Sequence, residues 1–117
     1  MRLWLTRPTR EGAVQLALAG EVDLATSSAL RAAIWDVLHD ERVTALIVDL
    51  GQVTFVDCAG ISALVAGHHT AATQKKCYAV VNARRQVLRI LDITGVLGTL
   101  SDRRYRAPSR QLFAWSR

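Results

Sequence analysis

Residues 52–65, QVTFVDCAGISALV, contain the junction that decides the fold: the end of a strand followed at once by the start of a helix. The side chains at 53–56 are mostly β-branched or aromatic, which is typical of a strand. From Ile61 onward, apolar residues recur at three- and four-residue spacing, which predicts a helix. Asp57 and Cys58 are therefore expected where a strand passes into a helix N-terminus.

Outward from this junction, short apolar strands alternate with amphipathic helices. Strands are expected at 2–6, 13–20, 42–52 continuing into 53–56, 77–82 and 96–102. Helices are expected at 24–40, from 58 to a polar end near 73–76, at 83–95 and at 109–116. Asp23 or Thr26 is the candidate cap of the first helix, and Gly95 is expected to close the third.

Strands that are apolar on both faces are typical of a parallel sheet covered by helices. The sequence therefore predicts an α/β fold. Its sheet is mixed but mainly parallel, with four to five strands, an antiparallel N-terminal edge strand and three to four covering helices. The 117 residues are expected to form one domain, 1–117, with a core at about 3–101 and a tail at 103–117.

Composition narrows the class of protein. Half of the residues are apolar, but no run approaches the roughly 20 apolar residues that a membrane span needs. No signal peptide is recognised at the N-terminus. Cys58 and Cys77 form neither a disulfide framework nor a zinc pattern, so we expect a reduced, cytoplasmic protein without metal or other cofactor. Cys77 is expected to be buried and unpaired.

The positive charge lies in the tail. Residues 103–117 hold five arginines and no acid, whereas residues 1–102 hold ten basic and ten acidic residues, so the tail carries the whole +5. Aromatic residues between the arginines suit nucleic acid or an acidic protein surface. The alternative is a last helix that packs its apolar side chains on the domain and leaves the arginines in solvent. We favour this alternative and expect no direct DNA binding.

Three segments together resemble the STAS domain family, which includes sulfate transporters and bacterial anti-sigma-factor antagonists. GEVD at 20–23 is similar to the family's G-E-hydrophobic-D segment. ALIVDLGQVTFVDCAGISALV at 45–65 resembles its central strand and helix start. VNARRQVLRILDITGVLGTL at 81–100 resembles the short helix that ends in a glycine. The likeness keeps order and spacing from residue 3 to about 101.

The resemblance implies a regulatory protein-binding module rather than an enzyme. In the antagonists, a serine directly after the aspartate is phosphorylated by the anti-sigma factor, which is also a serine kinase. The unphosphorylated antagonist binds that kinase and frees its sigma factor. By resemblance, the partner-binding residues here are Asp23, Asp57, Cys58, Ala59 and Gly60, with Ile61 and Leu64 behind them, and Gly60 lets the partner's backbone approach closely.

This chain departs from the family at the phosphoacceptor. Cys58 stands where the serine is expected and Ala59 follows it, so phosphorylation at position 58 is not expected. The thiol has three candidate roles: a packed side chain, a redox site, or a catalytic nucleophile. A helix N-terminus promotes thiolate chemistry, whereas the adjacent Asp57 carboxylate opposes it. Catalysis is disfavoured because His68 and His69 lie about 15 Å further along the same helix.

Two functions follow from the family resemblance. The first is an anti-sigma-factor antagonist whose partner is a serine-kinase anti-sigma factor. The second is a STAS adaptor subunit in a multi-protein sensory scaffold or a membrane transporter. A monomer or weak homodimer is expected. The adjacent His68 and His69 diverge by about 100° around a helix, so they are not expected to bind one metal ion.

Overall fold

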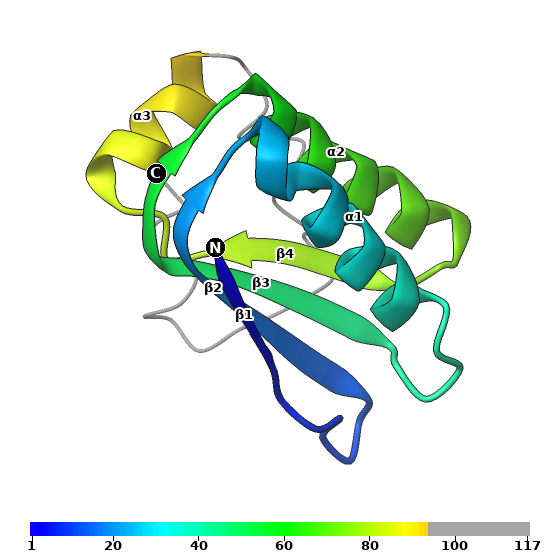
Figure 1. The fold of residues 1–117 in the computed structure, drawn as a ribbon. Coiled ribbons are helices and arrows are strands. Elements are labelled where there is room, and N and C mark those ends of the chain that lie inside the picture. The colour runs from blue at the N-terminus through cyan, green and yellow to red at the C-terminus, as the bar shows by residue number, and fades with distance from the viewer. Residues whose placement is uncertain (94–117) are drawn as a thin grey trace.

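The computed structural model describes residues 1–93 (Figure 1). Its elements are β1 (Arg2–Leu5), β2 (Ala13–Val22), α1 (Leu24–Leu38), β3 (Ala45–Val56), α2 (Cys58–Thr73), β4 (Cys77–Val81) and α3 (Arg85–Ile93). The predicted order of elements is confirmed as far as residue 93. The expected helix end at Gly95, the strand at 96–102 and the helix at 109–116 lie outside the described residues.

The strands of the described region form one sheet in the order β1-β2-β3-β4. β1 is antiparallel to β2, whereas β2 pairs with β3, and β3 with β4, in parallel. The mainly parallel sheet with an antiparallel edge strand is thus confirmed. β4 ends where Val81 pairs with Asp49, so the second half of the 12-residue β3 extends beyond it.

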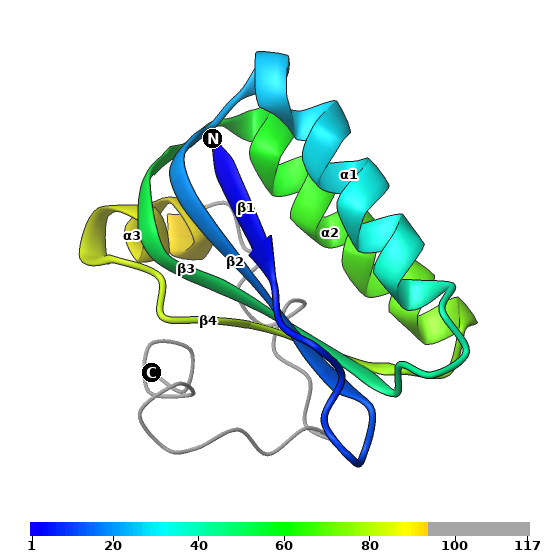
Figure 2. The ribbon, with the colours of Figure 1, turned by 60° about the horizontal axis from the view of Figure 1, so that its bottom comes forward.

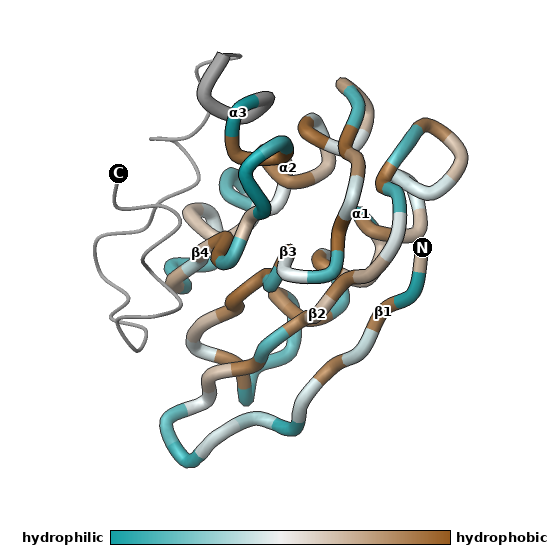
Figure 3. Tube along the Cα trace, turned by 90° about the vertical axis from the view of Figure 1, so that its left-hand side faces the viewer, coloured by the Kyte–Doolittle hydropathy of each residue, from teal (hydrophilic) through white to brown (hydrophobic). Residues whose placement is uncertain are grey.

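Helices cover both faces of this sheet. α1 and α2 lie side by side on one face, and α3 lies on the other, near the second half of β3 (Figure 2). Two hydrogen bonds hold α3 against β3. Arg84 Nε, directly before the helix, donates to Gly51 O, and Gln86 Nε2 in its first turn donates to Thr54 O. The strands are hydrophobic over much of their length, whereas the turn between β1 and β2 is hydrophilic (Figure 3).

The core lies mainly between the sheet and α1 and α2. Tyr78 reaches Leu64 O of α2, so Val80, two residues on, and its strand partners Val48 and Leu16 lie on the sheet face that α1 and α2 cover. Leu30 and Leu64 meet them from the two helices and are fully buried. Burial of this apolar surface is the main stabilising contribution, at about 25 cal/mol per Å².

Candidate functional site

The candidate site begins at the junction of β3 and α2. Asp57 is the N-cap of α2, and its Oδ1 accepts a hydrogen bond from Gly60 N at 3.0 Å. Its backbone carbonyl accepts from Ile61 N at 2.9 Å. An N-cap carboxylate satisfies amides that have no partner inside the helix and favours the positive end of the helix dipole. The predicted passage from strand to helix at Asp57 and Cys58 is confirmed.

The second oxygen of Asp57 reaches the other helix. Oδ2 accepts from Leu24 N, the first residue of α1, at 3.1 Å, while Asp57 N donates to Val22 O at 3.1 Å. One carboxylate therefore holds the N-termini of α1 and α2 together. The sequence identified Asp57 as a site residue but did not reveal this second contact, which joins residues 33 positions apart.

Asp23 caps α1 in a reciprocal arrangement with Thr26. Asp23 Oδ1 accepts from Thr26 N at 3.1 Å, and Thr26 Oγ1 accepts from Asp23 N at 2.9 Å. This pair is a capping box in which two exposed amides gain partners. Both candidate caps therefore contribute, with Asp23 at the N-cap. The structure brings the two aspartates of the predicted site to one end of the α1–α2 layer.

Cys58 is the first residue of α2 and is exposed, and Ala59 beside it is half-buried. Ile61 and Leu64 are buried, and Leu64 is fully enclosed. The outer part of the predicted site is thus Cys58 and Ala59, and the two apolar residues support it from below. Their burial is as expected, while a contact with a partner at this surface stays a prediction.

Gly60 has a packing role within the chain that the sequence did not predict. It is buried, and a Cβ placed on it would lie 2.7 Å from Val22 O and 2.9 Å from Val56 Cγ1. The missing side chain therefore lets α2 pack closely against the ends of β2 and β3. The structure thus gives Gly60 a packing role inside this chain, while the approach of a partner's backbone at this position stays a prediction.

Two exposed apolar residues near the site were missed by sequence reasoning. Leu24, whose amide binds Asp57, is 78% exposed, and Phe55, two residues before Asp57, is 44% exposed. Single exposed apolar side chains are common on protein surfaces, whereas contiguous apolar patches mark interaction sites. A signal was present for Leu24, because it falls outside the apolar stripe formed by Leu30 and Ile34.

The charged groups at this end are mostly acidic: Asp23 and Asp57 are half-buried, and Glu21 is exposed. On the neighbouring turns of the two helices, Arg31 Nη2 donates to Ser62 Oγ at 2.8 Å. Within the described range, no group of three or more histidine, cysteine or acidic residues is placed to hold a metal ion. The surface thus offers apolar and acidic groups around an exposed thiol, which suits contact with a protein.

The remaining candidate residues lie away from this end. His68 is half-buried and His69 is exposed, ten and eleven residues beyond Cys58 along α2, with their ring centroids 5.6 Å apart. Cys77 is half-buried rather than buried, which corrects the expectation. It pairs with Ala45 at the start of β3, whereas Cys58 follows the end of that strand. The two cysteines therefore lie at opposite ends of the sheet, too far apart for a disulfide.

The fold and the site define a small α/β protein with two capped helix starts at one exposed end. A family model described as the STAS domain matches residues 5–106. The chain belongs to the STAS domain family, as its resemblance to that family predicted. Among residues 1–93, no helix has the length and hydrophobicity needed to cross a membrane.

Two of the similar proteins are anti-sigma factor antagonists. The chain is 39% identical over 62 residues to the anti-sigma-F factor antagonist RsfB of Mycobacterium tuberculosis, a match that covers 53% of this chain and 50% of RsfB. It therefore spans about half the length of this curated relative. An anti-sigma factor antagonist from Mycobacterium paratuberculosis is 26% identical in its crystal structure, with a TM-score of 0.74 over 99% of this chain and 96% of the other.

The same fold also occurs within larger proteins. The murine anion transporter Slc26a9 matches with a TM-score of 0.68 and 21% identity, over 92% of this chain and 18% of the transporter. At this identity the likeness concerns the fold alone. The architecture therefore occurs both in an anti-sigma factor antagonist and within a larger transporter, and the fold alone does not identify a function.

Proposed function

We propose that this protein is an anti-sigma-factor antagonist, which binds an anti-sigma factor of the serine-kinase type and so releases its sigma factor. The observation that carries the proposal is the exposed surface at the starts of α1 and α2, within a chain whose curated relative is an anti-sigma-F factor antagonist. We define the antagonist surface as Asp23, Leu24, Asp57, Cys58 and Ala59, supported from within by Gly60, Ile61 and Leu64.

The physical basis of binding is the burial of exposed apolar area on a rigid support. Leu24 provides that area, and the Asp57 hydrogen bonds hold both helix starts in fixed positions. A preordered surface loses little conformational entropy when a partner binds. The protein then acts by competition: when it occupies the anti-sigma factor, the sigma factor is released in proportion to the free antagonist.

Cys58 changes how this binding is controlled. A thiol at the acceptor position is not a substrate for serine phosphorylation, so we propose that the protein binds its kinase without being inactivated there. Incubation with a serine-kinase anti-sigma factor and ATP is expected to add no phosphate at residue 58, as read by peptide mass spectrometry. Cys58→Ser is expected to gain phosphate at that position, and phosphate on Cys58 of the wild type would contradict the proposal.

Oxidation offers a second test of the same residue. Peroxide converts an exposed thiol to a sulfenic acid with release of water, which adds bulk and polarity at the helix start. Loss of binding in the wild type but not in Cys58→Ser would assign a redox role to Cys58. Equal binding before and after peroxide would leave it as a packed surface residue.

The function itself is tested with a complex of sigma factor and anti-sigma factor. The M. tuberculosis anti-sigma-F factor and its sigma factor are one probe, and partners captured from the source's own lysate and identified by mass spectrometry are the second. The wild type is expected to bind and displace the sigma factor in size-exclusion chromatography. Recovery of a transporter or a large STAS scaffold, with no anti-sigma factor bound, would instead assign the adaptor function.

Matched leucine variants locate the surface. Leu24→Gln is expected to weaken binding about tenfold, as for an apolar residue at the centre of an interface. Leu5→Gln is the control, because Leu5 is 53% exposed in β1 and lies outside the antagonist surface. Equal affinities of these two variants would show that the partner binds elsewhere.

A further inference from the structure

A groove of about 300 Å³ runs between α1 and α2, further along the helices than the antagonist surface. Ala63, Ala66 and Gly67 of α2 line it, together with Arg31 and Trp35 of α1. Arg31 hydrogen-bonds Ser62, which is four residues after Cys58, so the groove begins about 6 Å along α2 from the thiol. It is therefore a separate surface of the same helical layer, which we call the α1–α2 groove.

The α2 side of the groove is lined by small residues, and Gly67 among them faces the core. A Cβ on Gly67 would lie 2.6 Å from the Tyr78 hydroxyl and 2.9 Å from Ile34, so only glycine allows α2 to pack this closely. Tyr78 is fixed in turn, because its hydroxyl donates to Leu64 O at 2.8 Å. With Ala63 and Ala66 alongside, there is room for the side chains of another molecule between the two helices.

The α1 side of the groove carries two large residues that are already held in place. Trp35 is 55% exposed, and its ring stacks on His39 with centroids 3.7 Å apart and planes 20° from parallel. Arg31 is held by its hydrogen bond to Ser62 Oγ. Tryptophan and arginine dominate the energetics of many protein interfaces, and side chains that are preordered lose less entropy on binding.

The charge of the groove indicates the chemistry of its occupant. Arg31 is the charged residue among those that line the groove. Its side chain lies at the end of the groove that is nearest the starts of α1 and α2. We propose that the α1–α2 groove docks an amphipathic helix of a protein partner. That helix places two apolar side chains, one turn apart, against Trp35 and the small residues, and a carboxylate against Arg31. The inference does not depend on the antagonist function.

The test uses a designed probe, an alanine-based helical peptide of about sixteen residues. It carries two leucines four residues apart and a glutamate four residues further on, and a second peptide has lysine in place of that glutamate. Titration into the full-length ¹⁵N-labelled protein is expected to shift the amide signals of Ala63, Ala66 and Thr70 and the indole signal of Trp35. The acidic peptide is expected to bind about two- to fivefold more tightly than the basic one.

Variants separate this proposal from its alternatives. Arg31→Glu is expected to reverse the preference between the two peptides, and Ala66→Arg is expected to abolish binding by filling the groove. Arg10→Glu, the same charge change in the exposed β1–β2 turn, is the control. It is expected to change neither the binding of the peptides nor the preference for the acidic one. Signal shifts away from the groove, or equal binding of both peptides, would overturn the proposal. The proposal would also be overturned if the protein formed a homodimer that Ala66→Arg dissociates, because the occupant of the groove would then be a second copy of this chain.

Discussion

At the scale of single residues, the Asp57 carboxylate links two elements that are distant in sequence. Its two oxygens accept from Gly60 N in α2 and Leu24 N in α1. Asp57→Ala removes both bonds and leaves two helix-terminal amides without this partner. We expect a loss of about 2 kcal/mol in the free energy of unfolding, measured by urea denaturation. Asp36→Ala, at an exposed acid within α1, is the control; an equal loss there would contradict the double cap.

Gly60 supports a second prediction at this scale. In an ordinary helix, alanine is about 1 kcal/mol better than glycine. Gly60→Ala is nevertheless expected to destabilise the protein, because the added methyl would lie 2.7 Å from the backbone oxygen of Val22. Thermal unfolding should show a lower Tm than the wild type. Ser28→Ala, at an exposed position of α1, is the control, because it changes helix propensity alone. If Gly60→Ala raised the Tm as much as Ser28→Ala does, the packing role of Gly60 would be refuted.

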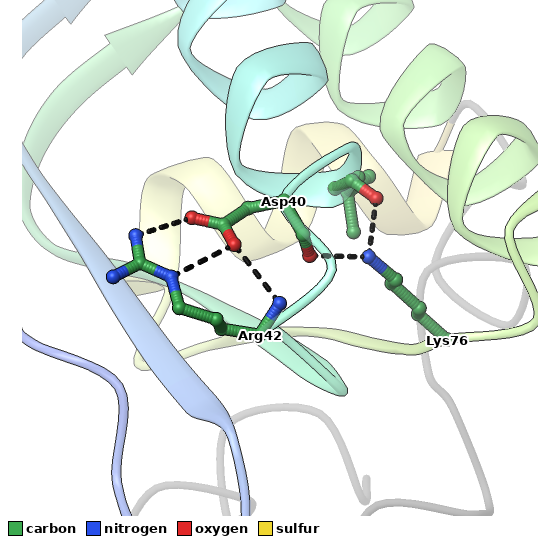
Figure 4. Close-up of polar contacts among 4 residues, drawn as sticks. Asp40, Arg42 and Lys76 are labelled. Carbon is green, nitrogen blue, oxygen red and sulfur yellow. Dashed lines mark hydrogen bonds and ion pairs between the residues drawn. The ribbon is translucent and has the colours of Figure 1, made fainter.

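At the scale of elements, the far end of α1 is held by a residue of the α2–β4 turn. Lys76 Nζ donates to Leu38 O and to Asp40 O, each at 2.7 Å, so an ammonium group meets the carbonyl end of α1 (Figure 4). A cation there satisfies exposed carbonyls and favours the helix dipole. Together with Asp57 at the other end, Lys76 fixes α1 relative to the rest of the fold at both termini.

Replacing this lysine tests its contribution to the helix end. Lys76→Met keeps the length of the side chain but removes both hydrogen bonds, and is expected to cost about 1–3 kcal/mol of unfolding free energy. Amide hydrogen exchange should accelerate most in the last turn of α1. Lys75→Met is the control, since Lys75 is exposed and undergoes the same charge change. Unaltered exchange in that turn would contradict the role of Lys76.

The turn after α1 predicts a pH dependence. Arg42 donates to Asp40 from its side chain and from its backbone N–H, and these bonds lower the Asp40 pKa from 3.8 to about 2. Because the folded-state pKa is the lower one, the stabilisation is fully present above about pH 4 and is lost as the pH falls toward 2. The pair lies at the surface, so its effect on overall stability is small.

Carboxyl NMR titration measures this directly. The Asp40 midpoint is expected near 2 in the wild type, and it should rise toward 3.8 in Arg42→Gln, which loses the guanidinium bonds but keeps the backbone one. Arg31→Gln is the control, because Arg31 bonds Ser62 in another part of the fold. An Asp40 midpoint that is the same in the wild type and Arg42→Gln would contradict the assignment.

At the scale of the whole molecule, the sheet separates the two cysteines. Cys77 begins β4 beside Ala45, while Cys58 follows the last residue of β3. Mass spectrometry of the oxidised protein is therefore expected to find no Cys58–Cys77 peptide. Alkylation by iodoacetamide should be faster at exposed Cys58 than at half-buried Cys77. A bridge between the two cysteines of one molecule would show that the two ends of the sheet are placed differently, and faster labelling of Cys77 would contradict their relative exposure.

Sequence patterns sufficed for features that depend on neighbours along the chain. The alternation of Val14, Leu16 and Leu18 has the two-residue period of a half-buried strand. The apolar stripe of α1 has the period of about 3.6 residues that is typical of a helix. Capping is also local, so Asp23 and Asp57 were recognisable as helix starts. The family motifs combined these signals, and the predicted sheet and the position of Cys58 are confirmed.

What the sequence by itself determined is therefore the order of elements, the mainly parallel sheet and the helix start at Cys58, because period and capping are properties of adjacent residues. Only the tertiary structure decided what crosses between elements: the bond from Leu24 to Asp57, the packing of Gly60 on Val22, and the groove beside Trp35. These contacts join residues more than thirty positions apart. They depend on how closely two helices and a sheet approach, which local pattern does not encode.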